Sequence, residues 1–255
     1  MAYLFENALV RKINKNIVNA LSNRNIRPSF ELISNEHNQY VNTLKKLGLN
    51  IYTLESLDDF PDSIFVEDPG LTYNNNYISL RPADKTRSGE SAILANEVSN
   101  FFDNIYYVKD GYIEGGDILR INNHFIIGLS CRTNKTGAEN LLKILRSLGA
   151  SVEIALTPKN ILHFKSECSL IEEDTILLTQ NMIDNNIFKK KYNFIKVPRG
   201  EEIAANSIRI NNNLLIPSGC PETEKILSKK YNLISLKVDE LFKIDAGLSC
   251  MSLRW

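Results

Sequence analysis

Long apolar runs and an excess of charge of either sign are both missing from this sequence of 255 residues. No window approaches the roughly 18 apolar residues that a transmembrane helix needs. The 30 basic and 30 acidic side chains cancel, so a sustained basic field for nucleic acid or an anionic membrane is not expected. The patterns GxGxxG, GxxxxGK[ST] and HExxH are also absent, so dinucleotide, phosphoryl-transfer and zinc-protease chemistry have no support. We expect no nucleic-acid or membrane partner and no metal or organic cofactor.

Cysteine and histidine are scarce, with four and three residues respectively. The cysteines lie far apart, without a CxxC pair or the spacing of a zinc site. The N-terminal stretch is charged and has no apolar core long enough for a signal peptide. We therefore expect free thiols in a reducing, cytoplasmic environment. Three of the cysteines are expected to be structural: Cys131, Cys168 and Cys220.

A loose internal repeat organises the chain, and no Gly-, Ser- or Pro-rich linker interrupts it. Each copy has a turn, a short apolar strand, a polar loop and an amphipathic helix, as in residues 122–149, where Gly149 ends the helix. Alternating strands and helices at periods of about 40–50 residues indicate an α/β fold built by repetition. The strands of four copies centre on Tyr77, Phe125, Ile176 and Leu214, and residues 29–50 supply a fifth helix. Five units fit a closed ring with a central site.

The C-terminal segment KIDAGLSCMSLRW is apolar and carries Cys250, so we expect it to be docked rather than frayed. A nucleophilic cysteine needs a base or cation to hold it as thiolate. His37 falls on the polar face of a helix and His124 in a turn, whereas His163 ends an apolar run. Cys250 and His163 are therefore the candidate pair. The alternative is a buried structural cysteine and an unrelated histidine.

Two acidic patches and two arginines complete the candidates. The segment DSIFVEDP is expected to place three acids around a strand at residues 64–66, and YIEGGDILRI places two acids around a glycine pair. Adjacent carboxylates beside a strand are costly unless they are solvated or bind a cation. These residues predict a polar site on the rim of a barrel, with ordinary solvated loop residues as the alternative: Asp62, Glu67, Asp68, Glu114, Asp117, Arg87 and Arg132.

Several segments, in order and covering nearly the whole chain, together resemble the dimethylarginine dimethylaminohydrolase family of the guanidine-modifying, or pentein, superfamily. They are FPDSIFVEDP, RPADKTRSGE, YIEGGDI, GLSCRTN, LHFKS, AANSI and KIDAGLSCMSLRW. The resemblance implies a five-unit α/β propeller that forms a single catalytic domain over residues 1–255. It implies hydrolysis of asymmetric dimethylarginine or monomethylarginine to citrulline through a covalent thiouronium on cysteine, without a cofactor.

The same resemblance implies the roles of individual residues. Cys250 is expected to be the nucleophile, His163 the general acid and base, and Glu114 the carboxylate that orients His163. Three acids are expected to face the substrate, Asp62, Glu67 and Asp68, and two arginines to bind its α-amino-acid end, Arg87 and Arg132. Leu21 would belong to a lid, Ile244 would offer a backbone contact, and Phe65 would shape the pocket with these two.

Alternatives within and outside the family remain. Another guanidine hydrolase, acting on arginine or agmatine, would use the same machinery, although such enzymes resemble longer chains. A non-catalytic binding protein of the same fold would lack the cysteine and histidine, and a cysteine peptidase would not need paired acids. The resemblance leaves a homodimer open. One departure is that Ala246 replaces the first glycine of a pair before Cys250, which would cost about 1 kcal/mol if that position needed positive φ.

Overall fold

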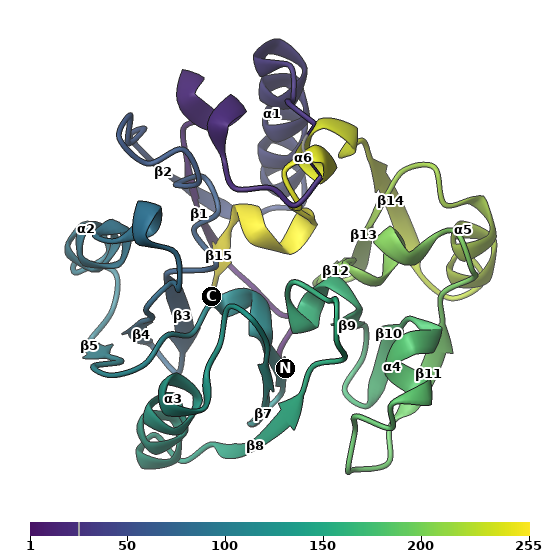
Figure 1. Ribbon diagram of the computed structural model, residues 1–255. Helices are drawn as coiled ribbons and strands as arrows, with labels where there is room; N and C mark the ends of the chain where they lie inside the picture. Colours follow the sequence, from purple (N-terminus) through teal and green to yellow (C-terminus); the bar gives the residue numbers. More distant parts are fainter. Residues whose placement is uncertain (25) are drawn as a thin grey trace.

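The computed structural model describes residues 1–24 and 26–255 and contains five sheets of three strands each. In the order given by their pairing, the sheets are β15 (Leu253–Arg254), β1 (Asn7–Arg11) and β2 (Asn50–Leu54); β3 (Gly70–Tyr73), β4 (Asn76–Ser79) and β5 (Asn104–Tyr107); β6 (Ile118–Ile121), β7 (His124–Leu129) and β8 (Ser151–Leu156); β9 (Cys168–Leu170), β10 (Thr175–Leu178) and β11 (Asn193–Lys196); and β12 (Ile208–Ile210), β13 (Asn213–Pro217) and β14 (Asn232–Leu236). The five lobes surround a common centre (Figure 1).

Each unit repeats one pattern of pairing. The middle strand pairs antiparallel with the strand before it and parallel with the strand after it. A helix connects the two parallel strands, because parallel neighbours need a crossover. These helices are α1 (Phe30–Lys46), α2 (Glu90–Glu97), α3 (Lys135–Ser147), α4 (Gln180–Asp184) and α5 (Pro221–Leu227). The expected five-unit α/β propeller is confirmed.

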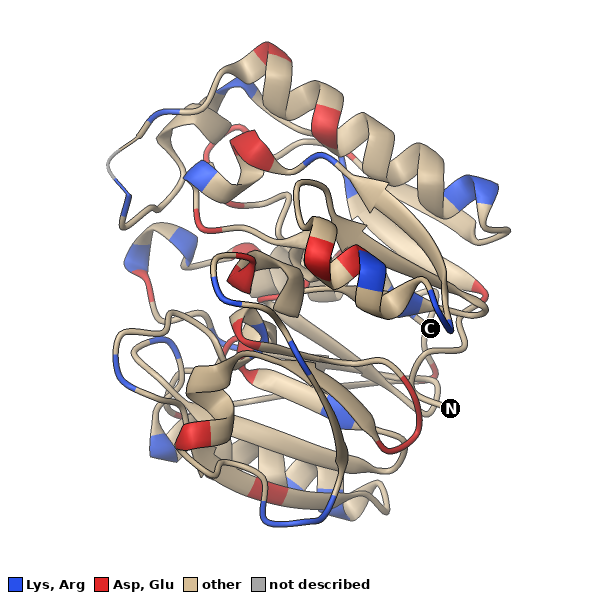
Figure 2. Cartoon of the chain, turned by 90° about the vertical axis from the view of Figure 1, so that its right-hand side faces the viewer, with Lys and Arg blue, Asp and Glu red and all other residues tan. Residues whose placement is uncertain are grey.

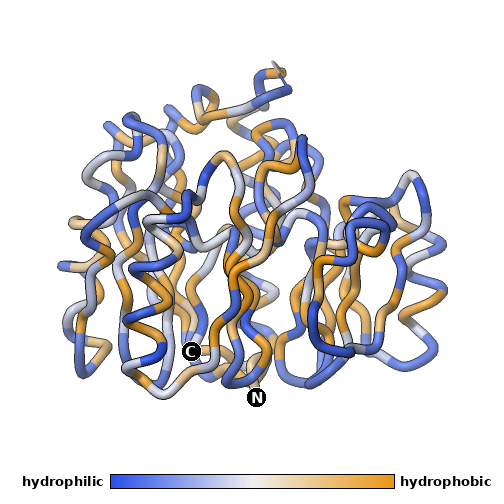
Figure 3. Tube along the Cα trace, turned by 60° about the horizontal axis from the view of Figure 1, so that its bottom comes forward, coloured by the Kyte–Doolittle hydropathy of each residue, from blue (hydrophilic) through white to orange (hydrophobic). Residues whose placement is uncertain are grey.

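The C-terminus completes the first unit. β15 pairs antiparallel with β1, so the last strand of the chain takes the place that β3, β6, β9 and β12 hold in the other units. Trp255 packs against Phe101 and Phe102, which fixes the end of the chain. The C-terminal segment is therefore docked, as expected, and both termini lie at the same end of the ring (Figure 3).

Local sequence explains the helices and turns. Ser29 accepts a hydrogen bond from the Leu32 N–H at the start of α1, and Asn134 accepts one from the Gly137 N–H at the start of α3. Asn74 and Asn75 both adopt positive φ in the turn between β3 and β4, a conformation that asparagine tolerates.

The core is divided among the units, with apolar clusters between neighbouring sheets and helices. Hydrophobic residues follow the strands toward the interior (Figure 3). Acidic and basic residues are interspersed over the face shown in Figure 2. Within the described residues, no helix has the length and apolarity required to cross a membrane.

The remaining short helices are α6 (Asp239–Lys243) and the 3₁₀ helices η1 (Lys15–Asn19), η2 (Lys85–Arg87), η3 (Gly115–Asp117), η4 (Phe164–Ser166), η5 (Glu202–Ala205) and η6 (Leu248–Met251). Arg87 lies in η2 and Cys250 in η6, whereas His163 directly precedes η4 and Ile244 directly follows α6. The expected strand at residues 64–66 is wrong, because this segment is a series of buried turns. Turns let consecutive side chains of this segment point to different surroundings, which a strand would restrict to two faces.

Candidate active site

Cys250 lies in η6, which a network of hydrogen bonds holds beside the acidic turn segment. Its carbonyl accepts the Glu67 N–H at 3.2 Å. Asn206, from the AANSI segment, accepts the Ser249 N–H at 3.0 Å. A Cβ on Gly247 would lie 2.3 Å from the Asn206 Oδ1, so only glycine allows this approach. The nucleophile candidate is thus fixed from two sides.

The replacement of glycine by Ala246 carries no backbone strain. Asp245 takes the positive φ of this loop, at 56°, and Ala246 is not among the residues with positive φ. The Ala246 N–H donates to the Leu241 carbonyl at 3.1 Å, which ends α6. The energetic cost that a positive φ at Ala246 would carry therefore does not arise.

His163 and Glu114 form a buried pair. The His163 Nε2 lies 2.7 Å from the Glu114 Oε2, and the other Glu114 oxygen accepts the Ala83 N–H at 3.0 Å. Burial lowers the pKa of His163, but the hydrogen bond to Glu114 and the charges of Asp117 and Asp68 outweigh it and raise the pKa to about 9. His163 therefore carries a proton at neutral pH.

Asp117, which the sequence grouped with the polar site without a role of its own, positions the histidine segment. It is fully buried, and its carboxylate accepts the Ser130 and Thr133 hydroxyls, both at 2.7 Å, and the Phe164 N–H at 2.8 Å. A Cβ on the neighbouring Gly116 would come within 2.7 Å of the His163 ring. The glycine pair before Asp117 was the available signal, because paired glycines mark a close approach.

One pocket gathers every predicted site residue except Glu67 and Asp117. It encloses about 30 Å³ and is lined by Leu21, Asp62, Phe65, Asp68, Arg87, Glu114, Arg132, Leu162, His163, Ile244, Asp245, Ala246 and Cys250. A second cavity of about 400 Å³ adjoins it and shares His163 and Cys250. The histidine and cysteine, 87 residues apart in the sequence, thus lie at the junction of two connected spaces.

Arg87 is enclosed by acids rather than open to solvent. Its Nη1 lies 2.6 Å from Asp68, and its Nη2 lies 2.7 Å from Glu90. Its remaining contacts include the Phe65 carbonyl, so all three guanidinium nitrogens are occupied. Burial raises the pKa of Asp68, but Arg87 and His163 outweigh it and lower the pKa. Glu90 was missed, although its position three residues after Arg87 on a helix start is a recognisable signal.

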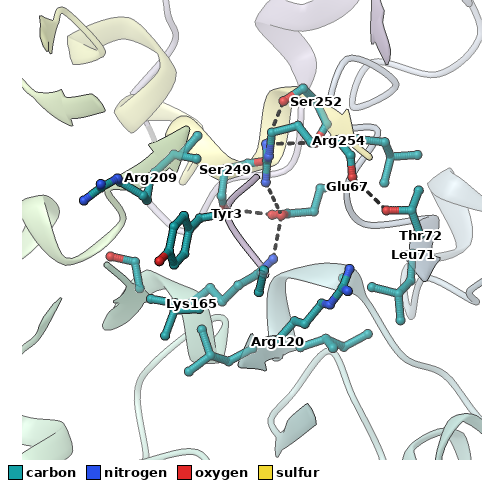
Figure 4. Close-up of a pocket in the computed structure, with 18 of the residues that line it drawn as sticks. Tyr3, Glu67, Leu71, Thr72, Arg120, Lys165, Arg209, Ser249, Ser252 and Arg254 are labelled. Atoms are coloured by element: carbon teal, nitrogen blue, oxygen red, sulfur yellow. Dashed lines mark hydrogen bonds and ion pairs between the residues drawn. The ribbon is translucent and has the colours of Figure 1, made fainter. Parts of the chain in front are cut away.

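Glu67 points away from this pocket. Its carboxylate accepts the Lys165 Nζ at 2.5 Å, the Ser249 Oγ at 2.7 Å and the Arg254 Nη2 at 3.3 Å. Figure 4 shows these side chains meeting in a different cavity, which is lined by the inner strands β3, β6, β9, β12 and β15. The structure thus separates Glu67 from Asp68, which the sequence had grouped.

Residues 21–24 cover the pocket. The Leu21 N–H donates to Asp62 at 3.2 Å, the Ser22 hydroxyl donates to the Lys243 carbonyl at 2.6 Å, and Arg24 pairs with Asp245 at 2.9 Å. Burial raises the pKa of Asp62 to about 6, against the lowering effects of Arg87 and the Leu21 N–H.

The thiol of Cys250 is protonated at rest. Burial, followed by the charges of Asp68 and Glu67, raises its pKa to about 12.

The pocket also offers a set of metal-ligand atoms, because donor atoms of Asp68, Glu114 and His163 lie within 4.8 Å of one another. Arg87 donates to the Asp68 Oδ2, and His163 and Glu114 bind each other, whereas the Asp68 Oδ1 is buried without a partner among the described residues.

The other histidines and cysteines lie elsewhere. His37 was expected on a polar helix face, but it is buried, and burial lowers its pKa to about 4. Cys168 and Cys220 are buried, and burial raises the Cys220 pKa to about 11, whereas Cys131 is exposed. A lowered pKa and an electropositive setting mark a reactive thiol, so the buried pair fits a structural role.

Known proteins share this architecture and sequence. The family model for arginine deiminase matches residues 57–213. An N(G),N(G)-dimethylarginine dimethylaminohydrolase from Pseudomonas aeruginosa is 33% identical and covers 99% of this chain and 100% of its own. The chain belongs to the dimethylarginine dimethylaminohydrolase family.

Two solved structures of this family superpose closely. The Pseudomonas aeruginosa enzyme, as a cysteine-to-serine mutant complexed with citrulline, has a TM-score of 0.93 at 32% identity and covers 99% of this chain and 100% of its own. A dimethylarginine dimethylaminohydrolase with histidine changed to glycine, as an adduct with S-methyl-L-thiocitrulline, has a TM-score of 0.94 at 33% identity and covers 98% and 100%.

Proposed function

We propose that this protein hydrolyses asymmetric dimethylarginine or monomethylarginine to citrulline and dimethylamine or methylamine. The observation that carries the proposal is the buried His163–Glu114 pair, which shares one pocket with Cys250 and Asp68. The named activity of the Pseudomonas aeruginosa relative and the citrulline and thiocitrulline bound in the family's structures support it.

The pocket suits a cationic guanidinium better than a neutral carbonyl. Asp68 and Glu114 are both buried carboxylates on the pocket wall. Charge-assisted hydrogen bonds from the substrate N–H groups to these oxygens would orient the guanidinium and hold its central carbon near Cys250. Glu67, turned to the other cavity, instead fixes the loop that carries the nucleophile.

The first half of the reaction forms a carbon–sulfur bond. The arriving substrate cation lowers the pKa of the Cys250 thiol, whose proton passes to solvent, and the thiolate adds to the guanidinium carbon. The bond from that carbon to the methylated nitrogen then breaks, and the amine leaves with a proton from His163. Since Nε2 of His163 faces Glu114, Nδ1 is the nitrogen free to exchange this proton. A planar thiouronium on Cys250 remains.

The second half reverses the proton flow. Neutral His163 takes a proton from water, and the hydroxide adds to the thiouronium carbon. The carbon–sulfur bond then breaks, and the proton of the new hydroxyl group passes to the departing sulfur, which restores the Cys250 thiol. The released ureido product is citrulline. The raised pKa of His163, about 9, keeps it protonated for the first half.

The far end of the pocket recognises a free amino acid. Arg132 is only partly engaged, with its Nη1 3.6 Å from Glu114, so its guanidinium is available to an α-carboxylate. Asp62 faces the same space and would pair with the α-ammonium group. Leu21, Phe65 and Ile244 form the apolar part of the wall. Arg87 supports Asp68 from behind.

Substrate entry requires residues 21–24 to move. A pocket of about 30 Å³ holds a few water molecules at most and no amino acid. The contacts of Ser22 and Arg24 with residues 243–245 must therefore open and re-form around the substrate. We further propose a cytoplasmic setting, in agreement with four free cysteines, and leave a homodimer as an outcome of sizing the purified protein.

The test is citrulline formation from asymmetric dimethylarginine, monomethylarginine, arginine and agmatine, with Cys250→Ser in parallel. We expect turnover of the methylated arginines and none by the variant. Turnover of arginine alone would keep the chemistry and overturn the substrate. No turnover of any guanidine by folded protein would favour a binding protein.

A further inference from the structure

The end of the ring opposite the catalytic pocket holds a cavity of about 140 Å³ lined by the inner strand of every unit. Five of the lining residues occupy equivalent positions in the inner strands of the five units. Each pairs with the second residue of the middle strand of its unit: Thr72 with Tyr77, Arg120 with Phe125, Leu170 with Ile176, Arg209 with Leu214 and Arg254 with Ala8. Three of the five equivalent positions carry arginine. The repeat itself therefore directs arginines toward this cavity.

The charge of this cavity is unbalanced. Its described lining includes four cationic side chains, Arg120, Lys165, Arg209 and Arg254, and a single carboxylate, Glu67. Lys165 and Arg254 both reach Glu67. Within the described chain, neither Arg120 nor Arg209 has a carboxylate within ion-pair distance. Burial alone lowers the pKa of Arg120, with only Tyr73 acting against it.

Unused hydrogen-bond donors accompany this charge. Arg120 and Arg209 each use Nε to donate to the carbonyl of an asparagine two residues on, at 3.0 Å and 2.6 Å. The guanidinium groups also lie over aromatic rings, that of Arg120 over Tyr73 and that of Arg209 over Tyr3. Among the described residues, no acceptor binds the Nη atoms of either arginine. The Nη1 of Arg209 and the hydroxyl of Ser169 are buried without a partner among the described residues, and Ser169 is only 8% exposed. Such groups are costly unless something binds them.

We propose that this cavity binds a small oxyanion, either inorganic phosphate or the phosphate group of a small ester. Arginine forks match the oxygens of phosphate, and the Ser169 hydroxyl would supply a further donor. The cavity has room for several water molecules and so for one tetrahedral anion. Figure 4 shows Arg209 beside Tyr3 on one side of this cavity, Arg120 beside Leu71 on the other side, and Lys165 between them. The site is distinct from the catalytic pocket, because the two have no lining residue in common.

The proposal is tested by calorimetric titration of the full-length protein with inorganic phosphate, with chloride keeping the ionic strength constant. Arg120→Gln, Arg209→Gln and Ser169→Ala remove one proposed contact each. Arg146→Gln is the matched control, because Arg146 is an exposed arginine on α3. Arg132→Gln reports on phosphate bound in the catalytic pocket instead. Glycerol phosphate replaces inorganic phosphate in a second series.

We expect one saturable site whose Kd rises about tenfold in Arg120→Gln and in Arg209→Gln, the loss of roughly one charge-assisted hydrogen bond, and less in Ser169→Ala. Arg146→Gln and Arg132→Gln should bind as the wild type does. Tighter binding of phosphate than of its ester identifies the free ion, and the reverse order identifies an ester.

Absence of saturable binding, or loss in Arg132→Gln with retention in Arg120→Gln and Arg209→Gln, overturns the proposal. If Arg120→Gln does not fold, Arg209→Gln and Ser169→Ala decide by the same criteria. The readout is binding, so it is independent of turnover.

Discussion

The two ends of the ring use opposite chemistry on one repeated backbone. The catalytic pocket is lined by four carboxylates, Asp62, Asp68, Glu114 and Asp245, together with His163 and two arginines. The opposite cavity is lined by four cations and one carboxylate. Glu67 and Asp68 are consecutive in the sequence, yet Glu67 belongs to the basic cavity and Asp68 to the acidic pocket. Adjacent acids in a buried turn thus serve different ends of the molecule.

This difference in charge explains why a cationic substrate would bind in the catalytic pocket rather than in the opposite cavity. A guanidinium is attracted to clustered carboxylates in a poorly solvated pocket and repelled by uncompensated arginines. Cys250 lies between the two, since its neighbour Ser249 donates to Glu67 while Cys250 itself lines the acidic pocket. The segment that carries the nucleophile is therefore anchored in the basic cavity through Ser249, whereas Cys250 itself faces the acidic pocket.

The largest effect is expected from neutralising the acidic side. Asp68→Asn should lower kcat/KM for the methylated substrate by at least about a thousandfold, because it removes a carboxylate that orients the guanidinium and leaves Arg87 with one counter-charge fewer. Citrulline formation measures this loss. Asp103→Asn, at an exposed position, is the control. Near-normal turnover by Asp68→Asn would remove Asp68 from the reaction.

Neutralising Glu67, the carboxylate of the basic cavity, should lower stability rather than turnover. Glu67→Gln leaves Lys165 and Arg254 without their counter-charge in a mostly buried setting, which should lower the free energy of unfolding by about 2–4 kcal/mol. Turnover of the folded protein should fall far less than in Asp68→Asn. Urea denaturation and citrulline formation on the same samples separate the two effects. An unchanged stability with a complete loss of turnover would place Glu67 on the catalytic side.

The sequence predicted the ring and most of the pocket because both depend on local, repeated signals. Tyr77, Phe125, Ile176 and Leu214, picked as strand centres, occupy equivalent positions in β4, β7, β10 and β13. The glycine pair at residues 115–116 marked a close approach, and it accommodates the His163 ring.

The features that the sequence did not predict depend on where a side chain points relative to segments that are distant in the sequence. Residues 62–69 were expected to form a strand flanked by acids, but the segment forms turns, and nothing in its composition shows that Glu67 and Asp68 diverge. His37 was placed on a polar face because its neighbours along α1 are polar, yet it lies on the buried face of this helix with Ile33 and Tyr40. The partners of such side chains come from segments more than 80 residues away, as Lys165 does for Glu67.

The pH dependence of stability should distinguish the two ends further. The pKa of His163 is raised from 6.5 to about 9, so its proton stabilises the folded state fully below pH 6.5, and that contribution is lost as the pH rises toward 9. The unfolding equilibrium should shift by up to about tenfold per pH unit in this window. The measurement is urea denaturation of Cys250→Ser, which removes the thiol. His163→Asn in the same background should flatten the profile, and Glu114→Gln should move the window to lower pH. A slope that survives in His163→Asn would assign the proton elsewhere.

The smallest expected effect concerns the amino-acid end of the acidic pocket. Burial raises the pKa of Asp62 to about 6, so the carboxylate is charged at pH 7 and mostly neutral at pH 5. Citrulline binding to Cys250→Ser should therefore weaken by about tenfold between these pH values, because the α-ammonium group loses its counter-charge. Adding Asp62→Asn should give the weaker affinity at every pH. Phosphate binding at the opposite cavity should be unaffected by Asp62→Asn, since Asp62 does not line it. A pH-dependent affinity that persists without Asp62 would show that another group binds the ammonium, and that the acidic pocket recognises its substrate through the guanidinium end alone.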